Sequence, residues 1–177
     1  DINFNYWFYK GISDVNFWSG FNLGNNLRDF SSYVTYDSLG RSISQMVNVD
    51  GNYRGNIWFG GGFPLFKKFM KVYLSCNGGT WSQNSFINGK KNTTTTSNIG
   101  PSIRLDKTAD KFNIQIYGEY HYNVPKSTIS DQASQSYYNY ELGGEISAKL
   151  PKKFFLTSDV VYTNNGNRWP GYNLNFT

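Results

Sequence analysis

Strict alternation of apolar and polar residues is the feature that most constrains how this chain folds. Between residues 111 and 122, one phase of the alternation is Phe112, Ile114, Ile116, Gly118, Tyr120 and Tyr122. The other phase is Asn113, Gln115, Tyr117, Glu119 and His121. Successive side chains of a β-strand point to opposite faces, so this pattern predicts a strand with one apolar and one polar face.

The same alternation recurs along the whole chain. Each segment has about the 9–11 residues that a tilted strand needs to cross a bilayer. The predicted strands lie near residues 2–9, 15–23, 53–63, 70–76, 98–105, 111–122, 138–150 and 154–163, and a ninth begins near Tyr172. Pro101 interrupts one of them because proline lacks a donor for the ladder, so a bulge or a protected edge is expected there.

The predicted connections alternate between short and long. Short turns are expected at 11–14, 64–67, 106–110 and 151–153, and long loops at about 24–51, 77–97, 123–137 and 164–171. The first long loop contains a hairpin signal, because residues 32–36 and 42–47 flank the glycine-bearing turn 37–41. Short turns on one side and long loops on the other are typical of bacterial outer-membrane barrels.

Composition supports a membrane barrel over a soluble globule. Aromatic residues make up 19% of the 177 residues, yet hydrophobic residues total only 38% and the mean hydropathy is -0.55. Barrels combine an apolar lipid-facing band, aromatic girdles and a polar lumen. No run approaches the roughly 18 apolar residues that a spanning helix needs, which excludes a helical membrane protein.

The net charge of +5 raises the possibility of nucleic-acid binding. Many of the lysines, however, lie in or beside predicted short turns rather than on one element: Lys67, Lys68, Lys71, Lys107, Lys111, Lys152 and Lys153. Solvated turns explain this arrangement better than a nucleic-acid surface does. Residues 1–177 are read as one unit without a signal peptide or plug, and because both ends lie within alternating segments, the unit is expected to be a fragment of a longer barrel.

Several short segments carry a resemblance to a known family. They are Tyr36-Asp37-Ser38-Leu39-Gly40-Arg41, Val47-Asn48-Val49-Asp50-Gly51-Asn52-Tyr53, Phe59-Gly60-Gly61-Gly62-Phe63-Pro64-Leu65, Asn84-Ser85-Phe86-Ile87-Asn88-Gly89, Asn98-Ile99-Gly100-Pro101, Leu150-Pro151-Lys152-Lys153-Phe154 and Thr163-Asn164-Asn165-Gly166. In order and spacing, the chain resembles the carboxy-terminal part of outer-membrane β-barrel proteins of Bacteroidota related to TonB-dependent receptors. The resemblance implies a barrel of about 22 strands, preceded by a regulatory-like domain and a plug.

The alternation also assigns side chains to faces. Charged or titratable residues expected to face the lumen are Arg54, Lys71, Arg104, Glu119, His121, Glu141, Glu145 and Asp159. Pairing across the wet lumen is the expected role of most of them, although contact with a plug or a solute is open. Aromatic residues expected at the lipid interfaces are Tyr6, Phe63, Tyr122, Tyr138 and Tyr162.

No catalytic site, metal site or cofactor is predicted. His121 lies in the polar phase near Glu119, but a triad also needs a nucleophile converging on the histidine. One histidine and one cysteine, Cys76, in opposite phases do not supply a metal-ligand cluster. Gly60-Gly61-Gly62 lacks the Lys-Ser/Thr and helix of a phosphate loop.

The leading functional hypothesis is therefore the all-β, transmembrane antiparallel barrel wall of a TonB-dependent-receptor-like uptake protein in the bacterial outer membrane. Its expected partners are outer-membrane lipid and lipopolysaccharide, TonB through an amino-terminal part, and a surface lipoprotein or other envelope subunits. The alternative is a non-transporting structural or interaction barrel within a larger envelope complex. A barrel hydrolase would need His121 within hydrogen-bond reach of a nucleophile.

Overall fold

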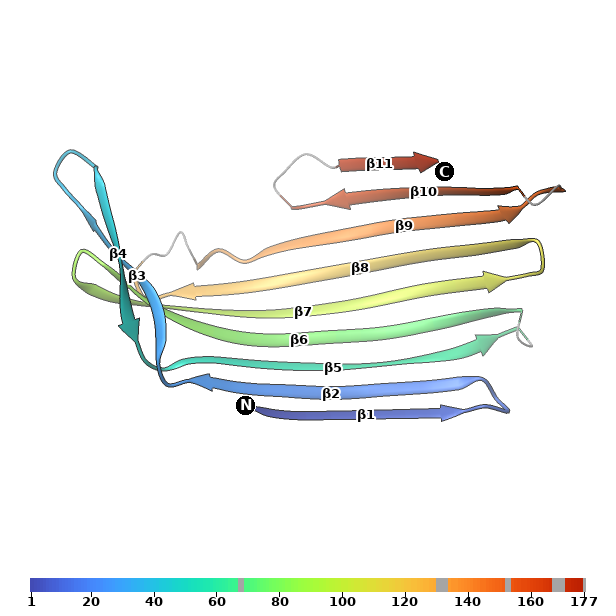
Figure 1. Cartoon of the computed structure of the whole chain (residues 1–177), viewed down its shortest axis with the longest axis horizontal. Coiled ribbons are helices and arrows are strands. Elements are labelled where there is room, and N and C mark those ends of the chain that lie inside the picture. The colour runs from blue at the N-terminus through green and yellow to red at the C-terminus, as the bar shows by residue number, and fades with distance from the viewer. Residues whose placement is uncertain (67–68, 130–133, 152–153, 167–170, 177) are drawn as a thin grey trace.

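The chain forms a single all-β sheet in the computed structural model (Figure 1). The structure describes residues 1–66, 69–129, 134–151, 154–166 and 171–176, with only the backbone of 172–176. Hydrogen-bonded neighbours follow the order β1-β2-β5-β6-β7-β8-β9-β10-β11, and β3 and β4 form a hairpin off this path. No helix in the described part of the chain is long and apolar enough to cross a membrane.

The strand bounds follow the alternating segments of the sequence. They are β1 (Ile2–Lys10), β2 (Val15–Asn26), β3 (Asp29–Tyr36), β4 (Ser42–Val49), β5 (Asn52–Leu65), β6 (Met70–Ile87), β7 (Lys90–Thr108), β8 (Phe112–Ser127), β9 (Tyr137–Lys149), β10 (Phe155–Asn164) and β11 (Gly171–Phe176). Every predicted strand is present, and so is the hairpin predicted within the first long loop.

The register keeps the two phases on separate faces across the sheet. Phe21 lies opposite Phe4 on β1 and Ile57 on β5, and Leu74 lies opposite Gly61 and Ile103. These residues belong to the apolar face. On the other side, which we call the polar face, Glu119 lies opposite Ser102 and Glu141. The alternation predicted from the sequence is therefore in phase from one strand to the next.

The sheet does not close on itself. β1 and β11 form its two edges, whereas the sequence predicts a closed barrel of which this chain is a part. The path between the edges contains nine strands, all paired antiparallel, so β1 and β11 run in the same direction (Figure 1). The only pairing of other sense in the described residues joins β3 and β6 in parallel over two residue pairs.

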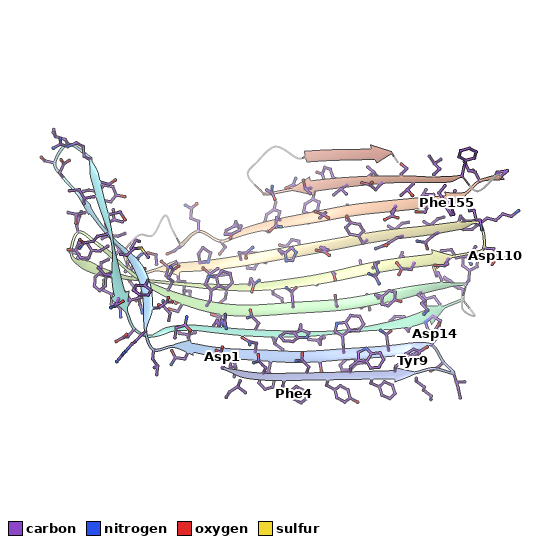
Figure 2. All side chains as sticks on the ribbon, in the orientation of Figure 1. Asp1, Phe4, Tyr9, Asp14, Asp110 and Phe155 are labelled. Carbon is purple, nitrogen blue, oxygen red and sulfur yellow. The ribbon has the colours of Figure 1, made fainter. Side chains whose placement is uncertain are left out.

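Short turns gather at one end of the sheet, which we call the turn end. Asp14 and Asp110 mark two of these turns (Figure 2). The predicted turns at 11–14 and 106–110 lie there, although β7 continues to Thr108. The predicted turns at 64–67 and 151–153 lie partly outside the described residues.

The opposite end, which we call the hairpin end, differs from the prediction. Residues 77–97 are predicted to be a long loop, but β6 and β7 extend through them and are joined by a tight turn at Asn88 and Gly89. Both turn residues have positive φ, 49° and 78°, which matches the type I′ turns favoured in hairpins. The polar Ser, Thr and Asn run here forms a ladder rather than an irregular loop. Residues 123–127, also predicted to be loop, belong to β8.

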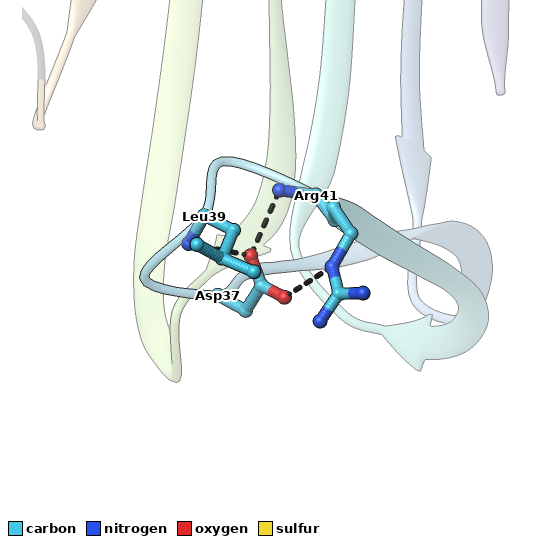
Figure 3. Close-up of polar contacts among 3 residues, drawn as sticks. All are labelled: Asp37, Leu39 and Arg41. Carbon is cyan, nitrogen blue, oxygen red and sulfur yellow. Dashed lines mark hydrogen bonds and ion pairs between the residues drawn. The ribbon is translucent and has the colours of Figure 1, made fainter.

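The β3–β4 hairpin lies at the hairpin end and runs at a steep angle to the strands of the path (Figure 1). Its turn is closed by the Asp37 carboxylate, which accepts hydrogen bonds from the backbone N–H groups of Leu39 and Arg41, both at 2.9 Å (Figure 3). The Arg41 guanidinium donates a further bond to Asp37 at 2.7 Å. The Arg41 side chain holds the pKa of Asp37 below its ordinary value, and the two backbone donors act in the same direction.

A buried polar network fixes the base of this hairpin to β5, β6 and β7. Asn84, which is 3% exposed, donates to the Asp50 carbonyl at 2.7 Å and accepts from the Thr93 hydroxyl at 2.8 Å. Asn52 accepts from the Asn84 backbone N–H and donates to Asp29, both at 2.8 Å. The hairpin base is thus held to the sheet by side-chain hydrogen bonds.

Pro101 lies in β7, between two paired neighbours, rather than at an edge. The β7–β8 register is the same on both sides of it, since Ile99 lies opposite Tyr122 and Ser102 opposite Glu119. The predicted bulge or edge is therefore wrong. The missing N–H opens a gap in the ladder without shifting its register.

Candidate binding site on the polar face

Two small residues, Ser75 and Ser102, lie under a hollow in the middle of the polar face. The register lines up Trp18, Gly60, Ser75, Ser102 and Glu119 across β2, β5, β6, β7 and β8. Ser75 and Ser102 add little volume above the sheet, and their hydroxyl groups lie 2.6 Å apart. The hollow above them has a volume of about 430 Å³.

Aromatic rings lie flat on neighbouring glycines around this hollow. Trp18 lies directly opposite Gly60, and a Cβ placed on Gly60 would come within 2.5 Å of its ring. Tyr73 covers Gly62 in the same way, at 2.5 Å. Tyr117 on β8 covers Gly143, which lies directly opposite it on the neighbouring strand β9. Each ring therefore has one face against the backbone, and the structure leaves all three rings only half-buried.

A second hollow of about 260 Å³ adjoins the first towards the hairpin end. The two share Trp18, Ser75, Ser102 and Glu119. Trp58, which lies over Gly20, forms part of its lining. The two hollows thus form one continuous depression lined by indole and phenol rings.

Polar groups complete the rim. Glu119 and Glu141 lie directly opposite each other on β8 and β9, and Tyr117 donates a hydrogen bond to Glu141 at 3.0 Å. Arg104 lies over the Tyr73 ring at 4.3 Å and forms an ion pair with Asp106 at 3.3 Å. Because Arg104 is already engaged, the two glutamates dominate the charge at this side of the hollow.

His121 lies beside this depression with Glu119, its Nε2 atom 3.5 Å from the carboxylate. It lies against Gly100, and Ser102, which lines the same hollow, is hydrogen-bonded to Ser75 instead. The described contacts do not bring a nucleophile to the histidine, so they give no support to the hydrolase hypothesis. Cys76 lies on the apolar face, opposite Phe59 and Pro101.

The other predicted lumen residues share the polar face but lie away from the hollow. Arg54 pairs with Asp1 at 3.2 Å towards the hairpin end, and Lys71 pairs with Asp14 at 2.8 Å at the turn end. Glu145 lies opposite Asp159. Among the described residues no group of three or more His, Cys, Asp or Glu is arranged to hold a metal ion.

The predicted interfacial aromatics all lie on the apolar face. Phe63 is two residues from the end of β5 at the turn end, and Tyr122 and Tyr138 lie opposite each other towards the hairpin end. Tyr162 is two residues before the end of β10, whereas Tyr6 lies in the middle of β1.

Charge alone did not identify the residues that form the hollow. Trp18, Trp58, Tyr73 and Tyr117 were missed because they are aromatic residues in the polar phase. A possible sequence signal is the glycine in the same phase of the alternation that accompanies each ring, either two residues away or on a neighbouring strand. Only the register shows which glycine each ring covers.

No family model, curated protein or solved structure matches this chain.

Proposed function

We propose that this chain forms part of the wall of an outer-membrane β-barrel that transports a ligand, in the manner of TonB-dependent receptors. The single observation that carries the proposal is the separation of the apolar and polar faces along the strands whose side chains the structure describes, from β1 to β10. A sheet with an apolar face, a polar face and no covering layer suits a barrel wall between lipid and a water-filled lumen.

The distribution of charge on the apolar face supports a bilayer. On β7 this face carries Ser97, Ile99, Pro101, Ile103 and Leu105 before the first charged residue, Lys107. The stretch from Ser97 to Lys107 rises about 33 Å along the strand, or about 25 Å at the tilt usual for barrels. That height equals the apolar band of outer-membrane barrels.

Open edges in lipid would leave backbone donors and acceptors unpaired at a cost of several kcal/mol each. The proposal therefore requires further strands between β1 and β11. Because the two edges of the nine-strand path run in the same direction, antiparallel closure needs an odd number of further strands, whichever chain supplies these strands. This agrees with the even totals of bacterial barrels.

Transport is favoured over a purely structural role by the depression on the polar face, which lies where a solute would pass. The alternative, a barrel that serves as an interaction subunit, is favoured by the β3–β4 hairpin. Its exposed apolar side chains include Phe30, Leu39, Ile43 and Met46, each at least 68% exposed. Uptake energy would come from TonB, and the barrel itself would carry out no covalent chemistry.

Cysteine labelling in native outer membranes tests the membrane assignment. In a Cys76→Ser background, single cysteines replace Ile57, Ile103 or Ile116 on the apolar face and Asn56, Ser102 or Gln115 on the polar face. A membrane-impermeant maleimide should label the polar set and leave the apolar set unmodified until the membrane is dissolved. Equal labelling of both sets would overturn the proposal.

Transport itself needs a separate readout. Deletion of the gene should abolish growth on, or accumulation of, a ligand that the wild-type strain takes up, and removal of TonB should have the same effect. Unchanged uptake, together with stable co-purifying envelope proteins, would favour the interaction subunit.

A further inference from the structure

We propose that two copies of this protein associate through β4, each copy pairing its β4 antiparallel with β4 of the other. β4 pairs with β3 on one side, and no strand in the described part of the chain pairs with its other side. Because the hairpin lies off the path between β1 and β11, closure of that path does not require β4. An open edge presents a row of backbone donors and acceptors to another strand.

The hydrogen bonds of β3 show which backbone groups of β4 face outwards. In an antiparallel pair, residues that bond to the partner strand alternate with residues whose N–H and C=O groups point away from it. On β3 the Val34 carbonyl and the Tyr36 N–H point away from β4, because both bond to Asn88, at 2.8 and 2.7 Å. Val34 and Tyr36 lie opposite Ser44 and Ser42. The residues of β4 that direct backbone groups to the free edge are therefore Ser42, Ser44, Met46 and Asn48.

β4 carries none of the features that usually protect a free edge. Residues 42–49 are Ser-Ile-Ser-Gln-Met-Val-Asn-Val, without a charged residue, a proline or a glycine. Natural edge strands are commonly protected by lysine, proline or a bulge. The side chains of Ile43 and Met46 are 74% and 70% exposed. An uncharged edge of this composition favours pairing with another strand.

A second β4 can satisfy every outward backbone group of the first. Antiparallel hydrogen-bonded pairs have to join outward residues of the two strands. A register centred on Gln45 does so, since it places Ser42 opposite Asn48 of the second copy and Ser44 opposite Met46. A shift of the centre to Ser44 or Met46 leaves one outward residue of each β4 without a partner in the other strand.

The side chains of the other phase are complementary in the same register. Ile43 lies opposite Val47 of the second copy, and β-branched side chains pair favourably across strands. Gln45 lies opposite Gln45, and because an amide both donates and accepts hydrogen bonds, the two side chains can bond to each other. β4 has no charged residue, so no like charges meet. This fit favours a second copy over an unrelated extended segment.

The direction of the hairpin permits the same pairing in a bilayer. A two-fold axis that relates two antiparallel strands has to cross them. β4 runs at a steep angle to the path strands (Figure 1), so an axis along the path strands crosses β4 and leaves both copies in the same orientation. The inference goes beyond the proposed function and does not depend on transport or on which face meets lipid.

Disulfide cross-linking of the full-length protein in native membranes tests the register. In a Cys76→Ser background, Gln45→Cys places two thiols opposite each other at the axis. This pair is not hydrogen-bonded, so its Cα atoms lie about 4.5 Å apart, within the range of disulfides. Ile43→Cys is the matched control, because Ile43 is exposed on the same face but its copy lies about 13 Å away along the strand.

We expect oxidation with copper phenanthroline to convert Gln45→Cys to a covalent dimer at least tenfold faster than Ile43→Cys. Equal rates would indicate random collision, and absence of a Gln45→Cys dimer would indicate that β4 is unpaired or is covered by another segment. Either result would overturn the inference.

A proline separates pairing from folding. Ser44→Pro removes an N–H group that points to the free edge and not to β3, and edge strands tolerate proline there. It should abolish the cross-link of Gln45→Cys. Ser38→Pro is the control, because Ser38 follows Asp37 in a turn closed by the Gly40 N–H, a position that favours proline. Cross-linking that persists in Ser44→Pro would overturn the inference.

Hydrogen exchange of residues 30–36 shows whether Ser44→Pro retains the hairpin. If the hairpin opens, Gln45→Lys replaces this variant, since it places like charges opposite each other on an exposed strand. Mass photometry in mild detergent should then give a dimer for the wild-type protein and a monomer for Gln45→Lys. A monomeric wild-type protein, or a dimeric Gln45→Lys variant, would overturn the inference.

Discussion

Asn84 is the residue whose removal should most clearly release the β3–β4 hairpin from the sheet. Its side chain is 3% exposed and joins two segments: it donates to the Asp50 carbonyl and accepts from the Thr93 hydroxyl. Asn84→Ala removes both bonds and leaves the two partner groups in a site that water reaches poorly. The bond from the Asn84 backbone N–H to Asn52 stays, so the ladder itself is not broken.

The expected cost follows from these contacts. A hydrogen bond contributes about 1 kcal/mol net, and a buried group left without a partner costs about 1–3 kcal/mol. Partial solvation of the opened site brings the total to about 2–3 kcal/mol. Because about 1.4 kcal/mol corresponds to a factor of ten, local opening of the hairpin should become roughly 30- to 150-fold more frequent.

Hydrogen exchange followed by mass spectrometry measures that opening directly. Peptides from 30–36 and 42–49 should exchange faster by the stated factor, whereas peptides from the paired centres of β7 and β8 should be unchanged. Ser44→Ala, on the exposed side of β4, is the control and should leave both sets unaltered. Unchanged exchange of the hairpin in Asn84→Ala would refute the role assigned to the buried network.

Three other perturbations test separate parts of the structure. Ile103→Lys on the apolar face should destabilise the protein in lipid vesicles by about 2–4 kcal/mol, measured by urea-dependent unfolding, whereas Gln115→Lys on the polar face should change stability little; equal effects would contradict the assignment of faces. Gly60→Val should force the Trp18 ring off the sheet and cost about 1–3 kcal/mol, with a shift in tryptophan emission, and an unchanged spectrum would contradict the seated geometry. The pKa of Asp29 is lowered by hydrogen bonds to its carboxylate. The largest effect comes from the Asn52 side chain, followed by the Asn26 side chain and the backbone N–H of Phe30. Its stabilisation of the hairpin base is therefore complete above about pH 4 and is lost as the pH falls through the lowered value. A fluorophore on the hairpin tip would report this pH dependence, and Asp29→Asn should remove it. If the pH dependence persisted in Asp29→Asn, Asp29 would be excluded as the titrating group.

Period-2 alternation was sufficient to predict the strands and their two faces, because the side-chain period of a strand is local and independent of its neighbours. It also predicted the hairpin around Asp37, where Gly40 adopts a φ of 77°. The extended β6–β7 hairpin was not predicted, because a Ser, Thr and Asn run reads as loop when no apolar phase is present. In the structure, this hairpin has paired neighbours on both sides, β3 beside β6 and β8 beside β7. These contacts are not visible in the local sequence.

The candidate site depends on register, which the sequence does not specify locally. Trp18 and Gly60 belong to strands separated by the whole β3–β4 segment, and their contact follows from the pairing of β2 with β5. The same holds for the small floor of Ser75 and Ser102, which lie on adjacent strands. Charged residues were easier to recognise in the sequence. Four of them, Arg104, Glu119, His121 and Glu141, line the two hollows, whereas Arg54 and Lys71 form ion pairs away from them.

The shared direction of β1 and β11 also limits how copies of this sheet can associate. If the sheet spans a bilayer as proposed, antiparallel pairing of β1 with β1 of a second copy would turn that copy upside down, with its β3–β4 hairpin on the opposite side of the bilayer. Pairing of β1 with β11 of another copy would have to be parallel. The proposed bilayer location would fix the orientation of every copy, so neither edge could pair antiparallel with another copy before further strands close the barrel. Such pairing is a hazard for soluble sheets with open edges.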